Sequence, residues 1–244
     1  RPPRSLNGGR PVGRDARAGT PAASMNPSRP ATVVATMVGP VTVDPTAWHP
    51  RDVGLVFLGD SLVNGLGDPR GQGWVTRVVA RSQTDDLELT AYNLGVRGAS
   101  SADVLDRFRD ECPPRFAGRG ERRLVVSVGR NDVDKHVSVA RHRLNLATIL
   151  DDAASTGIAT FVVSPPPVTD ASTNALLEVF VDAQADVCSR RGVHFVDCFR
   201  PLLGHDQWES DLAAAKVAEH PGQAGYGLIA WLVLNGGWRE WLRV

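Results

Sequence analysis

The stretch that decides the fold reads Val53-Gly54-Leu55-Val56-Phe57-Leu58-Gly59-Asp60-Ser61-Leu62-Val63-Asn64. Its first half is a nearly continuous apolar run, which is typical of a short strand buried on both faces of a parallel sheet. The run ends at a glycine, so Asp60 and Ser61 follow the carboxyl end of the strand, where ligands bind in open α/β sheets. A serine at this edge is a candidate nucleophile when a base reaches it. Aspartate and serine are equally residue types that cap helices.

Strand-like and helix-like segments alternate along the chain after Asp52. We expect strands at residues 53–58, 87–94, 123–128, 160–164 and 193–196. We expect helices at residues 74–80, 102–112, 139–155 and 172–191, and a last apolar helix through residues 228–233. The second helix should stop at Pro113-Pro114, and the fourth should bury Leu176, Leu177, Phe180, Val181 and Val187. Strands separated by helix-length crossovers predict a three-layer α/β/α sandwich around a parallel sheet of about five strands.

Residues 1–45 differ in composition from the rest of the chain. They are rich in Arg, Pro, Gly, Ala, Ser and Thr and lack sustained apolar periodicity, which predicts a flexible leader. We therefore expect a leader at 1–45 and one α/β domain at 46–244, with Met25 and Met37 as candidate natural starts. No apolar segment of the secretory type follows the N-terminal arginines, so we expect a cytoplasmic protein.

The composition argues against several classes of function. Lys plus Arg and Asp plus Glu number 27 each in 244 residues, so charge gives no reason to expect nucleic acid or a membrane surface as a partner. No apolar run reaches the roughly 18 residues of a transmembrane helix. The spacing of Cys112, Cys188 and Cys198 predicts free buried thiols, rather than a Cys188–Cys198 pair or a zinc site. We expect no metal and no cofactor.

Four chemically suited residues follow the expected strand ends or lie in the last loop. They are Ser61, Gly98, Asn131 and His220. Right-handed crossovers bring the carboxyl ends of parallel strands to one edge of the sheet, so the four should lie together. Acyl transfer needs a nucleophile, a base and donors for the developing oxyanion. A serine, a histidine, an asparagine amide and a glycine N–H supply that set.

Four sequence blocks resemble, in order and spacing, those of the SGNH (GDSL) hydrolase family, in its lysophospholipase-L1-like or acyl-esterase branch. They are Gly59-Asp60-Ser61-Leu62, Asn93-Leu94-Gly95-Val96-Arg97-Gly98, Gly129-Arg130-Asn131-Asp132 and His220-Pro221 with Gly225-Tyr226. The resemblance covers residues 52 to about 243 and implies the flavodoxin-like SGNH-hydrolase fold. It implies Ser61 as nucleophile and His220 as base. It also implies an oxyanion hole made of the N–H groups of Ser61 and Gly98 and the amide of Asn131.

The chain departs from the family pattern at Val217. The family usually places there an aspartate, which fixes the imidazole tautomer and stabilises the imidazolium. Three explanations stay open from the sequence. The first is a Ser–His dyad whose ring is oriented by a backbone carbonyl near Val217. The second is a substitute carboxylate, with Asp211 the best candidate and Glu219 or Asp206 behind it. The third is a lapsed enzyme.

The sequence therefore predicts a serine-dependent carboxylic ester hydrolase of esterase, lipase or thioesterase type. Its partner would be a small acyl ester: a short or medium acyl ester, a thioester, a lysophospholipid or an O-acetylated sugar. The alternative is a catalytically weak protein of the same fold that binds an ester or glycan ligand. A nucleotide binder fits poorly, because the glycines at 95 and 98 do not complete the fingerprint G-x-G-x-x-G.

Overall fold

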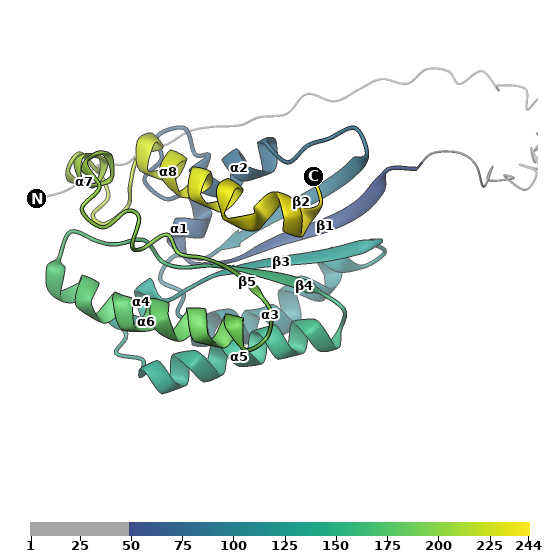
Figure 1. Ribbon diagram of the computed structural model, residues 1–244, viewed down its shortest axis with the longest axis horizontal. Helices are drawn as coiled ribbons and strands as arrows, with labels where there is room; N and C mark the ends of the chain where they lie inside the picture. Colours follow the sequence, from purple (N-terminus) through teal and green to yellow (C-terminus); the bar gives the residue numbers. More distant parts are fainter. Residues whose placement is uncertain (1–48) are drawn as a thin grey trace, which may run out of the picture. The chain divides into compact units, whose positions relative to one another are not determined.

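The computed structural model describes residues 49–244, so the leader expected at 1–45 lies outside the described residues. Five strands form one parallel sheet in the order β2-β1-β3-β4-β5. Helices cover both faces of this sheet (Figure 1), which confirms the expected three-layer α/β/α fold. The strands are β1 Arg51–Gly59, β2 Leu87–Gly95, β3 Glu121–Ser127, β4 Ala159–Val163 and β5 His194–Val196.

Strand β1 is buried on both faces, as its apolar run predicts. Val53, Leu55 and Phe57 belong to the core on one side of the sheet, whereas Val56 and Leu58 belong to the core on the other side. All five side chains are 0% exposed. Successive side chains of a strand point to opposite faces, so this one segment contributes to both cores.

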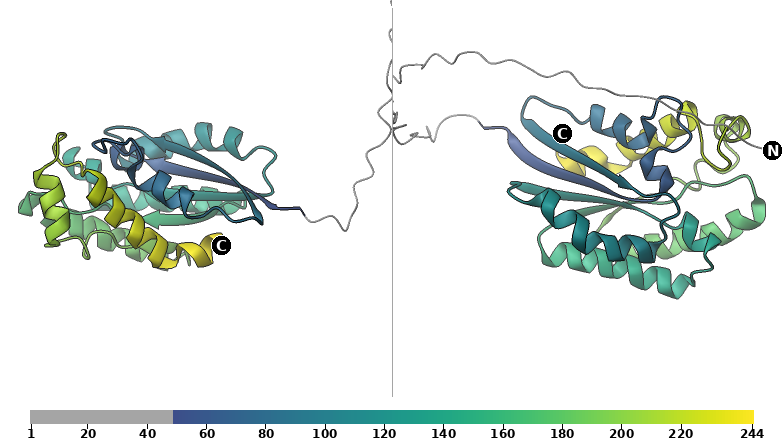
Figure 2. Two further views of the ribbon diagram at one scale, coloured as in Figure 1. Left: turned by 90° about the horizontal axis from the view of Figure 1, so that it is seen from above. Right: turned by 180° about the vertical axis from the view of Figure 1, so that it is seen from behind.

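The two helical layers divide cleanly between the two faces. Helices α2, α8 and α9 cover one face, and α3, α5 and α6 cover the other, as Figures 1 and 2 show from three directions. None of the helices within residues 49–244 is long and apolar enough to cross a membrane. The long helices are α2 Gly73–Ala80, α3 Ser101–Phe116, α5 Val139–Ser155, α6 Ala171–Ser189, α7 Asp206–Ala213 and α8 Gln223–Val233; α7 was not predicted.

The register of the sheet places three strand ends in one row. Gly59 of β1 lies opposite Gly95 of β2 and, on the other side, opposite Ser127 of β3. The short helices α1 Ser61–Asn64 and α4 Arg130–Asp134 begin just beyond this row. The blocks that carry Ser61, Gly98 and Asn131 therefore start from the same edge of the sheet.

Two glycines in this row allow a close approach of backbone segments. A Cβ on Gly59 would lie 2.3 Å from the Ser127 carbonyl oxygen, and a Cβ on Gly95 would lie 2.2 Å from the Asn64 nitrogen. Any side chain at either position would push α1 away from the strands, since such separations are far inside van der Waals contact.

Helix α3 runs four residues further than expected, through Pro113 and Pro114. Each proline removes a backbone donor, and the carbonyls left without their intrahelical partner belong to Arg109 and Asp110, which are exposed and can be hydrated. The last turn also buries Phe116, which continues the apolar row of Phe108 and Cys112 at intervals of four residues. Burial of this row outweighs the lost hydrogen bonds, and the prediction of a stop at Pro113 was wrong.

Helix α6 differs from the expectation in one side chain. Leu177, Phe180, Val181 and Val187 are buried as predicted, but Leu176 is 55% exposed. Leu176 is the neighbour of the buried Leu177 and lies about 100° around the helix from it, outside the stripe that faces the core.

The three cysteines are free and buried, which confirms that part of the prediction.

The C-terminal tryptophans separate into anchored and exposed residues. Helix α8 ends in a kinked turn in which Gly237 has φ 90°, and this left-handed residue directs Trp238 into the core. Trp238 is 0% exposed, stacks on Phe57 and donates its indole N–H to Ser82 Oγ at 2.8 Å. Trp231 is 62% exposed. The turn therefore fixes the C-terminal helix α9 Arg239–Leu242 to the sheet.

We predict that Trp238→Ala lowers the free energy of unfolding by about 3–5 kcal/mol, because it leaves a large cavity against Phe57. Trp231→Ala is the matched control and should change the free energy by less than about 0.5 kcal/mol, because its side chain is in water. Urea denaturation followed by circular dichroism measures both values. Equal effects of the two substitutions would contradict the described anchoring.

Candidate active site

The tight exit from β1 places Ser61 at the first turn of α1. Asp60 is the N-cap of this helix, and its Oδ1 accepts a hydrogen bond from the Leu62 N–H at 2.9 Å. The serine side chain is left facing a small pocket, and the residue is 5% exposed. The capping and catalytic interpretations of this pair are therefore compatible: the aspartate caps the turn that presents the serine.

His220 reaches Ser61 from the loop between α7 and α8. Its Nε2 lies 2.8 Å from Ser61 Oγ, and its Nδ1 lies 2.7 Å from the carbonyl oxygen of Ala218. A carbonyl only accepts hydrogen bonds, so Nδ1 must carry the proton in this contact. Nε2 is then free to accept the serine proton, which is the tautomer that general-base chemistry needs.

None of the carboxylates considered from the sequence contacts the ring of His220. Asp211 accepts from the backbone N–H of Gly225 at 2.8 Å and so caps α8. Asp206 lies in the first turn of α7. The carbonyl of Val217 accepts from the backbone N–H of His220 at 3.1 Å, not from its ring. The ring contacts the carbonyl of Ala218, next to Val217, which agrees with the first of the three explanations open from the sequence. The sequence did not identify Ala218 itself, because a backbone carbonyl has no side-chain signature.

Glu219 fixes the loop that carries His220 through hydrogen bonds to Thr169. It has φ 59°, a left-handed conformation that is costly for a residue with a Cβ. Its carboxylate accepts from the Thr169 backbone N–H at 3.0 Å and from the Thr169 hydroxyl. This contact fixes the loop next to His220, so the strained backbone is retained by a specific tether.

Asn131 connects the two segments that carry the expected backbone donors. Its amide nitrogen donates to Asp60 Oδ2 at 3.0 Å and to the carbonyl oxygen of Ala99 at 3.1 Å. Asp60 precedes Ser61, and Ala99 follows Gly98 in a turn where that glycine has φ 77°. The asparagine therefore sets the separation between the two backbone segments.

The charged groups beneath the site are held by hydrogen bonds. Burial raises the pKa of the Asp60 carboxyl to about 6, so it is largely ionised at neutral pH and accepts strongly from Asn131. Burial also acts to raise the pKa of Asp132, but hydrogen bonds from His142 and Ser101 outweigh it and keep that pKa below its usual value. Asp132 Oδ2 accepts from the Ser101 N–H at 2.9 Å, and His142 Nδ1 lies 3.1 Å from Oδ1. Asp132 thus joins the beginning of α3 to α4.

The pocket over the serine is small and has a mixed polar lining. Its volume is about 250 Å³, and Arg97 and Arg130 lie at its rim, the latter bonded to Asp134 at 2.5 Å. Among residues 49–244 there is no cluster of His, Cys, Asp or Glu side chains that would hold a metal ion. The lining residues are Ser61, Leu62, Arg97, Gly98, Arg130, Asn131, Asp134, Ala218, Glu219 and His220.

The fold is shared with solved esterase structures. A catalytic mutant of Axe2, an acetylxylan esterase from Geobacillus stearothermophilus, superposes with a TM-score of 0.64 at 19% identity, over 80% of this chain and 98% of that one. The psychrotrophic esterase EstA from Pseudoalteromonas sp. gives 0.60 at 18% identity, over 79% and 100% of the two chains. These similarities concern the fold.

Two curated proteins match parts of the sequence. Esterase TesA of Pseudomonas aeruginosa is 28% identical over 103 residues, which is 42% of this chain and 49% of that protein. The uncharacterized protein YpmR of Bacillus subtilis is 30% identical over 83 residues, which is 33% of this chain and 32% of that protein. The matches thus span about half of one relative and a third of the other.

The strongest comparison is with a family profile. It spans residues 57–228, well over half of the chain, and includes the serine, both expected oxyanion segments and the histidine. The chain belongs to the GDSL-like Lipase/Acylhydrolase family.

Proposed function

We propose that this protein is a serine-dependent carboxylic ester hydrolase that uses a Ser61–His220 dyad on small esters with a short acyl group. The observation that carries the proposal is the chain of contacts from Ser61 Oγ to His220 Nε2 at 2.8 Å, and from His220 Nδ1 to the Ala218 carbonyl at 2.7 Å. The membership of the GDSL-like family supports the same reaction class.

The reaction begins when Ser61 Oγ attacks the ester carbonyl carbon and its proton passes to His220 Nε2. The imidazolium returns this proton to the alkoxide as the carbon–oxygen ester bond breaks, which releases the alcohol and leaves an acyl-enzyme. Water then attacks the acyl carbon and gives a proton to His220 Nε2, which passes it to Ser61 Oγ as the acyl–serine bond breaks, and the carboxylic acid departs. The Ala218 carbonyl holds the ring in one tautomer throughout, in place of a carboxylate.

The developing oxyanion is stabilised by the backbone N–H groups of Ser61 and Gly98. Neither N–H donates to another group among the residues described, so both are available to a substrate oxygen. Both amide protons of Asn131 have acceptors in this state. Asn131 becomes the third donor when one proton turns from the Ala99 carbonyl to the oxyanion, while Asp60 retains the other.

The size of the pocket favours a short acyl group. Its volume of about 250 Å³ is below the roughly 300–1,000 Å³ of pockets that enclose drug-sized ligands. Arg97 and Arg130 line the same pocket as Ser61, so we expect the alcohol part of the ester to extend toward them. A small, partly polar site of this kind is better suited to acetyl or propionyl esters than to long-chain lipids.

We predict that Ser61→Ala abolishes hydrolysis of p-nitrophenyl acetate, because among residues 49–244 the His220 ring contacts no other hydroxyl or thiol. Ser210→Ala, at an exposed position on α7, is the control and should retain full activity. A series of p-nitrophenyl esters from acetyl to long-chain acyl should show highest kcat/KM at the short end. A fluorophosphonate should label Ser61 covalently in the wild type. A wild type that binds esters but neither reacts with the probe nor hydrolyses them would instead be a binding protein of this fold.

We predict that Asn131→Ala lowers kcat by about 10²–10³-fold with little change in KM, which is the usual cost of removing one oxyanion donor. Steady-state kinetics with p-nitrophenyl acetate gives both constants. The control is Asn235→Ala, because that amide only donates to the Trp231 carbonyl at 2.8 Å on an exposed helix end. A rise in KM at constant kcat would show that Asn131 binds the ground state instead.

We predict that Glu219→Ala lowers kcat by about 10–100-fold, because the loop that presents Ala218 and His220 loses its tether to Thr169 and the dyad loses its alignment. Glu219→Gln keeps one acceptor for Thr169 and should recover part of the rate. Asp211→Asn should stay within about threefold of the wild type, because an amide oxygen can still accept from the Gly225 N–H. A large loss in Asp211→Asn with none in Glu219→Ala would make Asp211 the orienting group.

A further inference from the structure

Another cavity within residues 49–244 lies away from Ser61, between the C-terminal halves of α3 and α5. Its volume is about 540 Å³, within the range of small-molecule sites. It borders Gly118 and Arg119, which precede β3, and Arg122 at the start of β3. Ser61 follows the opposite end of the neighbouring strand β1. Strand β3 is seven residues long, so the two sites are roughly 20 Å apart along the sheet.

The floor and walls of this cavity are apolar. Phe108, Phe116 and Ile158 contribute from α3 and from the start of β4, and each is less than 9% exposed. Cys112 also lines it, and burial raises the pKa of its thiol to about 12, so the thiol is uncharged at neutral pH. The cavity therefore accepts a hydrophobic body and disfavours a charge at its base.

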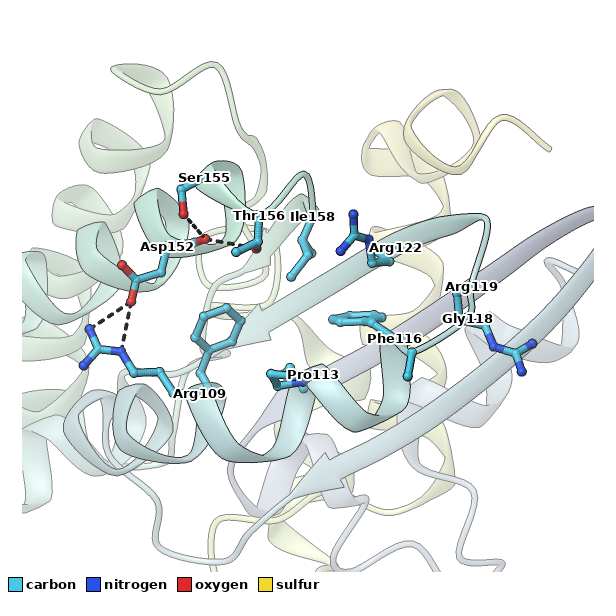
Figure 3. A pocket seen from close by; sticks show the side chains of 13 residues that line it. Arg109, Pro113, Phe116, Gly118, Arg119, Arg122, Asp152, Ser155, Thr156 and Ile158 are labelled. Atoms are coloured by element: carbon cyan, nitrogen blue, oxygen red, sulfur yellow. Dashed lines mark hydrogen bonds and ion pairs between the residues drawn. The ribbon is translucent and has the colours of Figure 1, made fainter.

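The rim carries three arginines, two of which already have carboxylate partners. Arg109 pairs with Asp152 at 2.9 Å, and Arg119 pairs with Asp52 at 2.8 Å. The guanidinium of Arg122 has no hydrogen-bond acceptor and no carboxylate partner among residues 49–244. Figure 3 shows the Arg109–Asp152 pair at one end of the cavity and Arg122 at the other, near Ile158 and Phe116. One unpaired guanidinium thus lies beside an apolar hollow.

Several carbonyls at the ends of the two helices already accept hydrogen bonds, although those of Arg109 and Asp110 in α3 lack intrahelical partners. At the end of α5, the Ala153 carbonyl accepts from the N–H groups of Thr156 and Ile158, and the Ala154 carbonyl accepts from Gly157. At the end of α3, the Phe116 carbonyl accepts from the Arg119 N–H. Carbonyls that are paired in this way attract a cation only weakly.

We propose that this cavity, which is separate from the Ser61 site, binds a carboxylate with a hydrophobic body, such as a medium-chain fatty acid. The carboxylate pairs with the guanidinium of Arg122, whose fork geometry matches two carboxylate oxygens. The hydrocarbon lies between Phe108, Phe116 and Ile158. One free cation matches one anionic head group, and the apolar walls select against a ligand with a second charge.

The isoleucines of the chain provide a direct readout, because they are Ile149, Ile158 and Ile229. Ile158 lines the cavity, whereas Ile229 lies in the core on the opposite face of the sheet. Octanoate, titrated into the full chain with labelled isoleucine methyl groups, should shift the Ile158 signal to saturation and leave Ile229 unchanged. Octanol has the same chain without the charge and should bind at least about tenfold more weakly, since it lacks the charged pair.

Arg122→Gln should weaken octanoate binding by about tenfold or more and leave octanol binding unchanged. The exposed position of Arg122 makes the variant compatible with folding, and Arg122→Lys should keep part of the affinity. The matched control is Arg239→Gln, which removes an exposed arginine on the other helical layer and should not change binding.

Three results would overturn the proposal. Octanoate and octanol would bind equally if the cavity were apolar and did not recognise the carboxylate. Octanoate would leave Ile158 unshifted while competing with ester hydrolysis if it bound only at the Ser61 site. The Ile158 signal would shift with protein concentration in the absence of ligand if a second copy of the chain filled the cavity.

Discussion

The close approach of two glycines, Gly59 and Gly95, to neighbouring backbone atoms underlies the whole site. At Gly59 the chain passes so close to the Ser127 carbonyl, and at Gly95 so close to Asn64, that a single added carbon would overlap its neighbour. This closeness lets β1 end flush with β2 and β3 and lets α1 begin at once. Ser61 is thereby held by three neighbouring strands rather than by a free loop. If Ser61 is the nucleophile, as we propose, its attachment to a strand buried on both faces means that it loses little entropy when the substrate arrives, which is how positioning contributes to rate.

The two segments proposed to hold the oxyanion are joined at that edge by polar side chains that contact both. Asn131 reaches the residue before Ser61 and the residue after Gly98, while Asp132 reaches Ser101 at the start of α3. The buried polar network then continues from His142 to Gln184 at 3.1 Å. Such a network rigidifies a core where its members are satisfied, and this one is satisfied except at its far end, where Gln184 Oε1 has no partner among the residues described. The consecutive residues Asn131 and Asp132 therefore have different contacts: Asn131 joins the segments next to Ser61 and Gly98, and Asp132 joins α4 to the start of α3.

The sequence predicted the features that follow a periodic apolar pattern or depend on particular side chains. The parallel sheet, the two-sided core of β1 and the convergence of Ser61, Asn131 and His220 followed from apolar runs and from strand ends. A backbone carbonyl near Val217 was one of three explanations for the orientation of His220. The sequence could not single out Ala218, because it acts through a carbonyl that every residue possesses. Val217 correctly showed that the usual carboxylate is missing. The sequence did not show that the Asp211 carboxylate accepts from the Gly225 N–H and the Glu219 carboxylate from the Thr169 N–H. Backbone geometry in a loop is fixed by long-range contacts that local sequence does not encode.

The wrong prediction that α3 stops before Pro113 also has a consequence for the large cavity. Local propensity ends α3 at Cys112 because proline removes a donor, yet burial of Phe116 extends it by one turn. That turn carries Phe116 to the wall of the large cavity and leads to the segment that ends at Arg122. If the helix stopped at Cys112, the apolar hollow would lose one wall and the guanidinium would stand alone in water, where an ion pair contributes little. The competition between propensity and burial in one helical turn therefore decides whether the far edge of the sheet can hold a ligand.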